Sequence, residues 1–419
     1  MRENISLEEA QDLLLSIIKP TGEEKISINN ALNRVISCDI KAGENIPHFA
    51  RSAYDGYAFK AEDTKMASKD QPIVLQVLEE VPAGYPPTKK VVSGTTIKVM
   101  TGAPIPEGAD TIINYEVTAR VGNELSLFAA YKVGANIIPA GEDLEKGQLV
   151  VAKGAVITPP IIGLLASLGI SEVPVFKKPF VSIVSTGDEL INIDEHLKPA
   201  KIRNSNAYSL QAYLQDLGAA SRIIGTAKDR VEEVKDYVAV GLDGAEMVIT
   251  TGGISVGDYD VVEEALGALG AELVFRQIEI KPGSPTLAAV KDDKIILCLS
   301  GNPASALVIF QLLGAPMIKK MAGKTSYLSE KISVELMEDF PKKSPKRRFL
   351  RGTLILEDGK TGVRLTGAQG NSVLRSMVGC NLLVDIPGGS GSLTKGTKLT
   401  ATLEWDKGTG VLSHLEERI

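Results

Sequence analysis

The sequence predicts a multidomain α/β and β protein, because the pattern of apolar runs, polar residues, Pro and Gly changes several times along the chain. Strands and helices alternate between Phe180 and about Lys320, which is typical of a parallel sheet with helices on both faces. Short β-like runs broken by Pro and Gly fill residues 46–145 and return between Ile332 and Trp405. A chain of 419 residues is long enough for about two to four domains.

These changes divide the chain into four expected units. Residues 1–45 and 146–178 are expected to form a helical N-terminal domain with its linkers, and 46–145 a β-rich module inserted into it. Residues 179–327 should form the α/β domain and 328–419 a C-terminal β domain.

Two helices are expected in the N-terminal domain. Ser6 and Glu9 have the spacing of a capping box, and one face of residues 6–18 carries Leu7, Ala10, Leu14 and Ile17. A second helix should begin at Thr158, with Pro159 in its first turn, and run to Leu168. We expect it to pack against the N-terminal helix.

The α/β domain is predicted element by element. Apolar runs predict strands at residues 181–184, 222–225 and 247–250, and amphipathic runs predict helices at 207–217, 231–240 and 260–269. A hairpin of residues 287–290 and 294–299 should lead into a long helix from Ala304. Farther on, Asp358-Gly359 is typical of a hairpin turn, and the basic run 342–348 reads as a solvated linker.

Composition excludes several classes of protein. The net charge of −6 argues against general nucleic-acid binding, and no apolar run of about 18 residues predicts a membrane span. With only three histidines, the chain offers few candidates for a zinc site or a Ser-His-Asp triad. The N-terminus lacks a secretory pattern, and three widely spaced cysteines, expected in or near cores, fit the reducing cytoplasm: Cys38, Cys298 and Cys380.

Polar residues follow each predicted strand of the α/β domain. The third strand runs into the loop 250–253, whose glycines allow close backbone approach and whose N–H groups suit an anion. The other groups are Ser185 to Glu189, then Thr226 and Asp229, then Ser255 and Asp258, and finally Ser300 to Pro303 with Ser305. Because the carboxyl ends of parallel strands meet at one edge, these groups predict one binding site.

The residue types indicate the chemistry of that site. Hydroxyls and glycine N–H groups suit anionic oxygens, whereas the carboxylates need a cation such as Mg²⁺ beside phosphate. Lys281 adds a fixed positive charge. We therefore predict a phosphate-bearing small ligand with Mg²⁺, although Asp188, Glu189 and Asp229 could equally cap helices. Neither a Walker loop nor a dinucleotide fingerprint is present.

Three polar turns also interrupt the β-rich module. They are Ser52 to Ala58, Met100 to Pro104 and Gly141 to Asp143. Capped structural turns and a second functional cluster explain them equally well.

Taken together, these segments closely resemble the MoeA family of molybdopterin molybdenumtransferases, which includes the E domain of gephyrin. The matching segments occur in family order: 52–58, 100–108, 141–143, 185–190, 251–258, 281–285 and 301–305. The resemblance implies elongated four-domain subunits with a central MogA-like α/β/α domain, a C-terminal β-barrel-like domain and a homodimer. It also implies the reaction, in which adenylylated molybdopterin and molybdate give molybdenum cofactor and AMP, with Mg²⁺.

The same resemblance assigns roles to individual residues. The catalytic positions would be Asp55, Asp143, Glu189, Asp229, Asp258 and Lys281, with Asp229 and Asp258 at the metal. The substrate-binding positions would be Thr101, Thr186, Gly187, Thr251, Gly252, Gly253, Ser255, Gly257, Pro282, Gly283, Gly301, Asn302, Pro303, Ser305, Lys346 and Ser372. A MogA-like adenylyltransferase would be the source of the substrate.

Three departures from the family pattern keep alternatives open. Gln277 and Ser284 stand where many relatives carry lysine, and Lys346 stands where an arginine is expected. A non-catalytic molybdopterin-binding scaffold of the same fold is therefore the alternative function. A nucleotide-processing enzyme that shares only the α/β domain, as in the CinA family, would leave the β-module segments unexplained.

Overall fold

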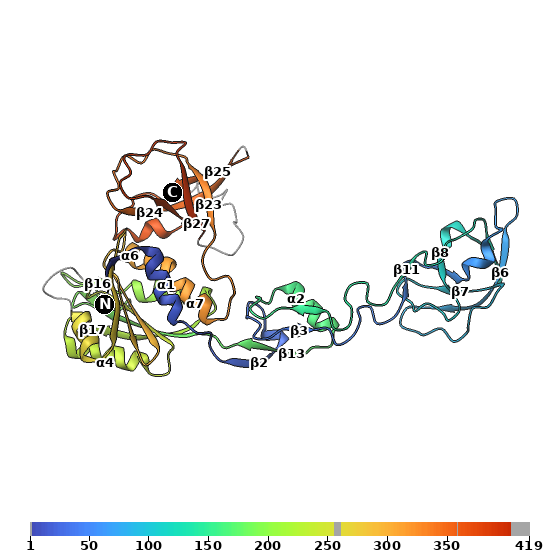
Figure 1. The fold of residues 1–419 in the computed structure, drawn as a ribbon, viewed down its shortest axis with the longest axis horizontal. Coiled ribbons are helices and arrows are strands. Elements are labelled where there is room, and N and C mark those ends of the chain that lie inside the picture. The colour runs from blue at the N-terminus through green and yellow to red at the C-terminus, as the bar shows by residue number, and fades with distance from the viewer. Residues whose placement is uncertain (1, 255–260, 358, 404–419) are drawn as a thin grey trace.

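A computed structural model describes residues 2–254, 261–357 and 359–403 of an elongated subunit. The central and C-terminal domains lie together at one end, and the β-rich module lies at the other (Figure 1). A small unit lies between them, built from β2 (Glu23–Ser27), β3 (Ile40–Lys41), β12 (Leu149–Val151), β13 (Glu172–Phe176) and α2 (Pro159–Ser167).

The central domain is built on a seven-stranded sheet in the order β1-β19-β21-β22-β18-β14-β17. The three predicted strands are confirmed as β14 (Phe180–Thr186), β17 (Ala220–Ala227) and β18 (Met247–Thr251). With β22 (Lys294–Leu299) they form four neighbouring parallel strands, and β21 (Leu287–Lys291) pairs antiparallel with β22 as the predicted hairpin.

Helices cover both faces of this sheet, which confirms the α/β/α architecture. α4 (Val231–Leu242) and α5 (Val261–Ala268) pack on one face, and α3 (Asn206–Asp216) packs on the other beside a helix of residues 303–321. That helix comprises α6 (Pro303–Ile309), the π-turn η4 (Phe310–Gly314) and α7 (Ala315–Met321). Its length and apolarity would suit a membrane span, but 89% of it is buried inside the protein, so it is a core helix.

The N-terminal helix is placed differently from the prediction. α1 (Leu7–Ile17) has the predicted cap, since the Glu9 N–H donates to Ser6 Oγ at 3.1 Å. However, it does not pack on α2. Its apolar face joins the core of the central domain, because β1 (Arg2–Ile5) pairs parallel with β19 (Glu272–Ile278) and draws the helix there. Neither β1 nor β19 was predicted.

The inserted module contains a six-stranded sheet in the order β8-β5-β7-β6-β10-β9. The β-like runs expected in this module include β7 (Thr95–Val99) and β8 (Thr111–Asn114). The others are β5 (Gly56–Phe59), β6 (Ile73–Val81), β9 (Ala119–Val121) and β10 (Glu124–Leu127), and β4 (Arg51–Ser52) pairs with β11 (Ile137–Ile138) beside them. Ile46 forms a bridge with Leu144, so the two connections to the module run together.

The C-terminal domain is a closed barrel of five strands. These are β23 (Lys331–Leu336), β24 (Arg347–Glu357), β25 (Lys360–Leu365), β26 (Leu382–Ile386) and β27 (Lys398–Leu403), and pairing of β24 with β26 closes the ring. Glu357 pairs with Lys360, which confirms the predicted hairpin, although Asp358 lies outside the described residues. A short strand from the central domain, β20 (Ile280–Lys281), pairs parallel with β24.

Two smaller expectations are wrong. The basic run 342–348 is only partly a solvated linker, because Arg347 and Arg348 begin β24 and are half-buried. Cys38 is exposed, whereas Cys298 and Cys380 are buried as expected.

Candidate functional site

The polar strand ends of the central domain meet at one edge of the sheet, as predicted. Ser185 lies beside Thr251 in the β14–β18 register, and Thr251 lies beside Leu299 in the β18–β22 register. Thr186 pairs with Ala227 on the other side, two residues before Asp229. Segments separated by more than a hundred residues of sequence therefore contribute to one edge.

Glycines allow the loops at this edge to approach one another. Gly252 has a φ of 91°, and a Cβ there would lie 2.3 Å from the carbonyl oxygen of Thr186. A Cβ on Gly253 would lie 2.8 Å from Thr186 Oγ1, and one on Gly301 would lie 3.5 Å from Gly252 Cα. The loops after β14, β18 and β22 are therefore in contact. Ser255, Gly257 and Asp258 lie outside the described residues.

Two asparagines organise the hydroxyls and were not predicted. Asn204 Nδ2 donates to Ser185 Oγ at 2.9 Å and to Thr226 Oγ1 at 3.3 Å, so it ties two strand ends together. Asn206 Nδ2 donates to the Gly301 carbonyl at 2.9 Å, while its buried Oδ1 has no partner among the described residues. Their position at the start of α3, with Asn204 two residues before it and Asn206 its first residue, was the available signal.

Two carboxylates flank the Gly187 turn. The Asp188 N–H donates to Asp229 Oδ2 at 3.2 Å, and Glu189 folds over Gly187, whose Cβ would lie 2.5 Å from its carboxylate. Asp229 and Glu189 are both exposed. No group of three or more metal-ligating residues occurs among the described residues. Asp229 and Glu189 supply the one or two carboxylates that Mg²⁺ takes from a protein when a phosphate and water provide its other ligands.

Lys281 and Ser305 lie where the central domain meets the barrel. Lys281 is exposed on β20, and its register partner is Arg348. Gly283 follows in tight contact with α6, since a Cβ there would lie 2.3 Å from Ile309. The Ser305 N–H donates to the Asn371 carbonyl at 3.2 Å. The exposed Ser372 follows Asn371 and is therefore adjacent to the start of α6, which begins at Pro303.

A buried arginine holds the barrel loop that reaches Ser305, and it was not predicted. Arg351 is fully buried; Nε donates to Ser376 Oγ and Nη2 to the Gly370 carbonyl, both at 3.0 Å. Its Nη1 has no hydrogen-bond partner in the described part of the chain. Burial lowers the pKa of Arg351 to about 10, because the charged guanidinium is separated from water. The expected cation Lys346, by contrast, is exposed immediately before β24.

The two positions without the usual lysines have local structural roles. The Gln277 N–H donates to the Thr286 carbonyl at 2.8 Å, and Ser284 Oγ donates to the Ile278 carbonyl at 2.9 Å. Gln277 lies near the end of β19 and Ser284 follows β20, so both help to hold the short strand that carries Lys281, and neither brings a charge to the site.

A second polar cluster lies in the β-rich module. Asp55 Oδ1 accepts hydrogen bonds from both the N–H and the hydroxyl of Thr101, each at 2.7 Å. The Thr101 N–H, followed by its hydroxyl, lowers the pKa of the Asp55 carboxyl because both stabilise the charged form. Asp143 is exposed near the base of the module, where its N–H donates to the Ile46 carbonyl.

The module and the central domain lie at opposite ends of the subunit (Figure 1). One subunit therefore does not bring Asp55 and Thr101 near Asp229 and Lys281.

Comparisons with known proteins place these features in one family. Three family models match in order: the MoeA N-terminal region (domain I and II) at residues 5–169, a probable molybdopterin binding domain at 182–320, and the MoeA C-terminal region (domain IV) at 333–403. The matches outside the central domain rule out the hypothesis that only the α/β domain is shared.

Curated relatives and solved structures agree over nearly the whole length. The molybdopterin molybdenumtransferase of Bacillus subtilis (strain 168) is 34% identical over 96% of this chain and 94% of its own. That of Staphylococcus aureus (strain Mu50) is 35% identical over 87% of both chains. A molybdopterin biosynthesis MoeA protein structure from Pyrococcus horikosii has a TM-score of 0.85 at 31% identity, covering 96% of this chain and 99% of that one. With its α/β/α domain, inserted module and closed barrel all matched, the chain belongs to the MoeA family.

Proposed function

We propose that this chain is a molybdopterin molybdenumtransferase in molybdenum cofactor biosynthesis. Adenylylated molybdopterin and molybdate would be its substrates, and molybdenum cofactor and AMP its products. The observation that carries the proposal is the edge of the central sheet, where glycine loops and hydroxyls converge in a chain that matches these transferases along its length.

The central edge supplies groups that suit the phosphates of the substrate. The Gly252 loop permits close approach of the backbone, and Thr186 and Thr251 place hydroxyls in the same row. Mg²⁺ would be held by Asp229 with Asp258, next to Glu189, and when bound it supplies positive charge beside the scissile phosphoanhydride. Asp229 is held in place for this role by the Asp188 N–H.

Molybdate would bind at the junction of the central domain and the barrel. A dianion there meets the charge of Lys281 and the start of α6 at Ser305. Arg351, whose Nη1 has no partner among the described residues, would bring a further cation to this junction, whereas the Arg348 guanidinium lies over the Phe340 ring of the barrel. Arg351 would partly offset the two lysines missing at Gln277 and Ser284, and the exposed Lys346 and Ser372 would lie at the rim of the site.

The distance between the two polar clusters supports a dimer. In a homodimer, the module of a second copy would bring Asp55, Thr101 and Asp143 to the central edge of the first. We expect the protein to act in the cytoplasm and to receive its substrate from a MogA-like adenylyltransferase.

The test is AMP release by the purified chain with adenylylated molybdopterin, Mg²⁺ and molybdate, with metal on the pterin measured alongside. AMP release with matching incorporation of molybdenum is the expected result. Tight pterin binding without AMP release at high molybdate would instead favour the non-catalytic scaffold.

A further inference from the structure

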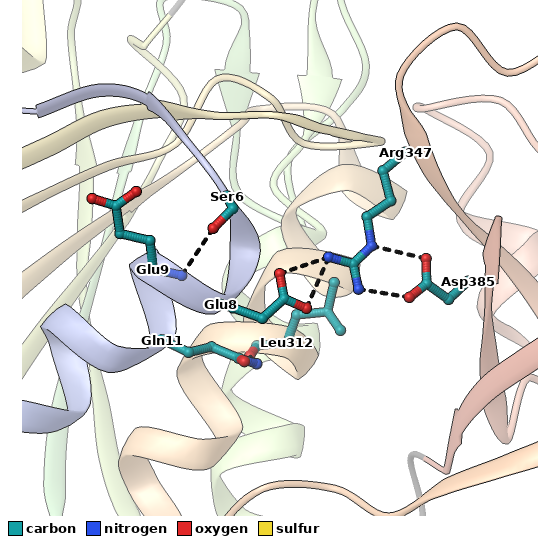
Figure 2. A network of polar contacts seen from close by, with 7 residues as sticks. All are labelled: Ser6, Glu8, Glu9, Gln11, Leu312, Arg347 and Asp385. Carbon is teal, nitrogen blue, oxygen red and sulfur yellow. Dashed lines mark hydrogen bonds and ion pairs between the residues drawn. The ribbon is translucent and has the colours of Figure 1, made fainter. Parts of the chain in front are cut away.

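One guanidinium joins the C-terminal barrel to the N-terminal helix. Arg347 Nη1 donates to both carboxylate oxygens of Glu8, at 2.9 and 2.7 Å, while Nε and Nη2 donate to Asp385 at 2.9 and 2.6 Å (Figure 2). Glu8 lies on α1 and Asp385 on β26. The hydrogen bond from Arg347 lowers the pKa of Glu8, and the bond to Asp385, followed by the one to Glu8, raises that of Arg347.

Glu8 is held on a fixed part of the central domain. The Ser6 cap closes the first turn of α1, and Gln11 Nε2 donates to the Leu312 carbonyl at 2.8 Å (Figure 2). Leu312 belongs to the π-turn of the core helix. Any shift of Arg347 relative to Glu8 is therefore a shift of the barrel relative to the central domain.

Arg347 also lies on the strand that carries the barrel's share of the proposed site. Alternate residues of β24 share a face, so Arg347, Phe349 and Arg351 point the same way. Phe349 is buried in the core of the central domain, whereas its neighbour Leu350 is buried in the barrel. The Arg347 guanidinium lies 5.2 Å from the Phe349 ring, and Arg351 holds the loop that reaches Ser305.

Elsewhere along the seam, where the barrel meets the central domain, the barrel is held by the short pairing of β20 with β24, by the hydrogen bond from Ser305 to Asn371 and by apolar contacts. Phe349, Met377 and Leu383 give it apolar contact with the central core, but such contact has little directional preference. Cavities of about 440 Å³, lined by Glu8, Gln311 and Arg347, and of about 290 Å³, lined by Gln311 and Met377, lie along the seam. An arginine that donates several hydrogen bonds to two carboxylates is directional. It can therefore fix the angle between the barrel and the central domain, which apolar packing alone does not fix.

We propose that the Arg347–Glu8 ion pair is a positioning contact that orients the barrel over α6 and thereby sets the affinity of the site for its oxyanion substrate. The inference rests on the proposed function. Without the pair, the barrel stays attached through its apolar contacts and the β20 pairing, but the Arg351-held loop no longer holds a single position over Ser305. Binding of molybdate should weaken while the carboxylates around Asp229 are unaffected.

The test compares Glu8→Ala with Glu9→Ala. Glu9 lies next to Glu8 on α1 but points away from Arg347 and pairs with Arg2, so its variant loses the same charge and leaves the seam intact (Figure 2). Glu8→Ala should raise the KM for molybdate by roughly three- to tenfold with kcat within about twofold, in line with the modest energy of a half-exposed pair. Glu9→Ala should match the wild type.

A distance measurement reports the orientation without the reaction. Spin labels on cysteines introduced at Ser16 on α1 and Lys395 on the barrel, in a Cys38→Ser background, should give one narrow distance distribution in the wild type and a broader one in Glu8→Ala. Equal KM values and equal distributions in the Glu8 and Glu9 variants would overturn the positioning role. An inactive wild type would instead refute the transferase, and the label distances would still decide whether the pair orients the barrel.

Discussion

The two polar clusters of this subunit use similar groups but are built in different ways. In the β-rich module, a carboxylate and a threonine from two turns bind one another directly, so Asp55 is already satisfied by Thr101. At the edge of the central sheet, Asp229 and Glu189 flank a glycine turn, and Asn206 Oδ1 lacks a partner among the described residues. In the first cluster one carboxylate oxygen is already paired within the module, whereas the second cluster has a buried polar atom that no described residue pairs with.

The test of the central cluster with the largest expected effect is a substitution at Gly252, where the loop after β18 comes very close to the backbone of Thr186. Gly252→Ala should destabilise the protein by about 3 kcal/mol and abolish activity, because the new Cβ meets the Thr186 carbonyl at 2.3 Å with φ positive. Urea unfolding measures the change. The exposed Gly267 of α5 is the control, since its Cβ meets nothing within 4 Å, and Gly267→Ala should be neutral or slightly stabilising. Equal stability of both variants would mean that the loops are not in contact.

The module cluster is tested by Asp55→Asn, which keeps the shape but removes the charge. We expect kcat to fall by about 10²–10³-fold with an unchanged melting temperature, because a preorganised charged group is lost from the reacting site. Co-expression with Asp229→Asn then tests the dimer. If each site combines two subunits, randomly mixed dimers should recover about one quarter of wild-type activity. No recovery would mean that the two residues do not act in sites shared between subunits.

The open cluster should respond to the metal as well as to the substrate. Asp229→Asn should raise the Mg²⁺ concentration for half-maximal AMP release by about tenfold or more, since a carboxylate ligand is lost. Asp236→Asn on α4 is a charge-matched comparison outside both clusters. A metal titration that is unchanged by Asp229→Asn would remove this residue from the metal site.

Restoring a missing lysine tests whether Lys281 and Arg351 already compensate for it. Ser284→Lys should lower the KM for molybdate by at most about threefold, because Lys281 and Arg351 already bring positive charge to the junction. A much larger gain in affinity would show that Arg351 does not face the anion. Steady-state kinetics with varied molybdate gives the comparison.

The smallest expected effect is the pH dependence of the seam. The ordinary pKa of Glu8 is 4.5 and folding lowers it, so the ion pair stabilises the protein above about pH 4.5 and is lost as the pH falls through the lower folded value. With half of the side chain exposed, the contribution is at most about 1 kcal/mol. The difference in unfolding free energy between the wild type and Glu8→Gln should therefore vanish in acid.

The sequence predicted what depends on local pattern. Alternation predicted β14, β17 and β18, and the glycines at 252 and 253 indicated the close loop contact. It could not predict which core α1 would join, because the pairing of β1 with β19 links residues about 270 positions apart. The same limit applies to Arg351, whose role depends on a loop that closes over it in three dimensions.

The bridge between Ile46 and Leu144 has a wider consequence. The chain leaves and re-enters the middle of the molecule at one place, so the roughly one hundred intervening residues can be gained or lost as a block without rerouting what remains. The β-rich module can therefore be exchanged as a unit while the connections among the other domains stay the same.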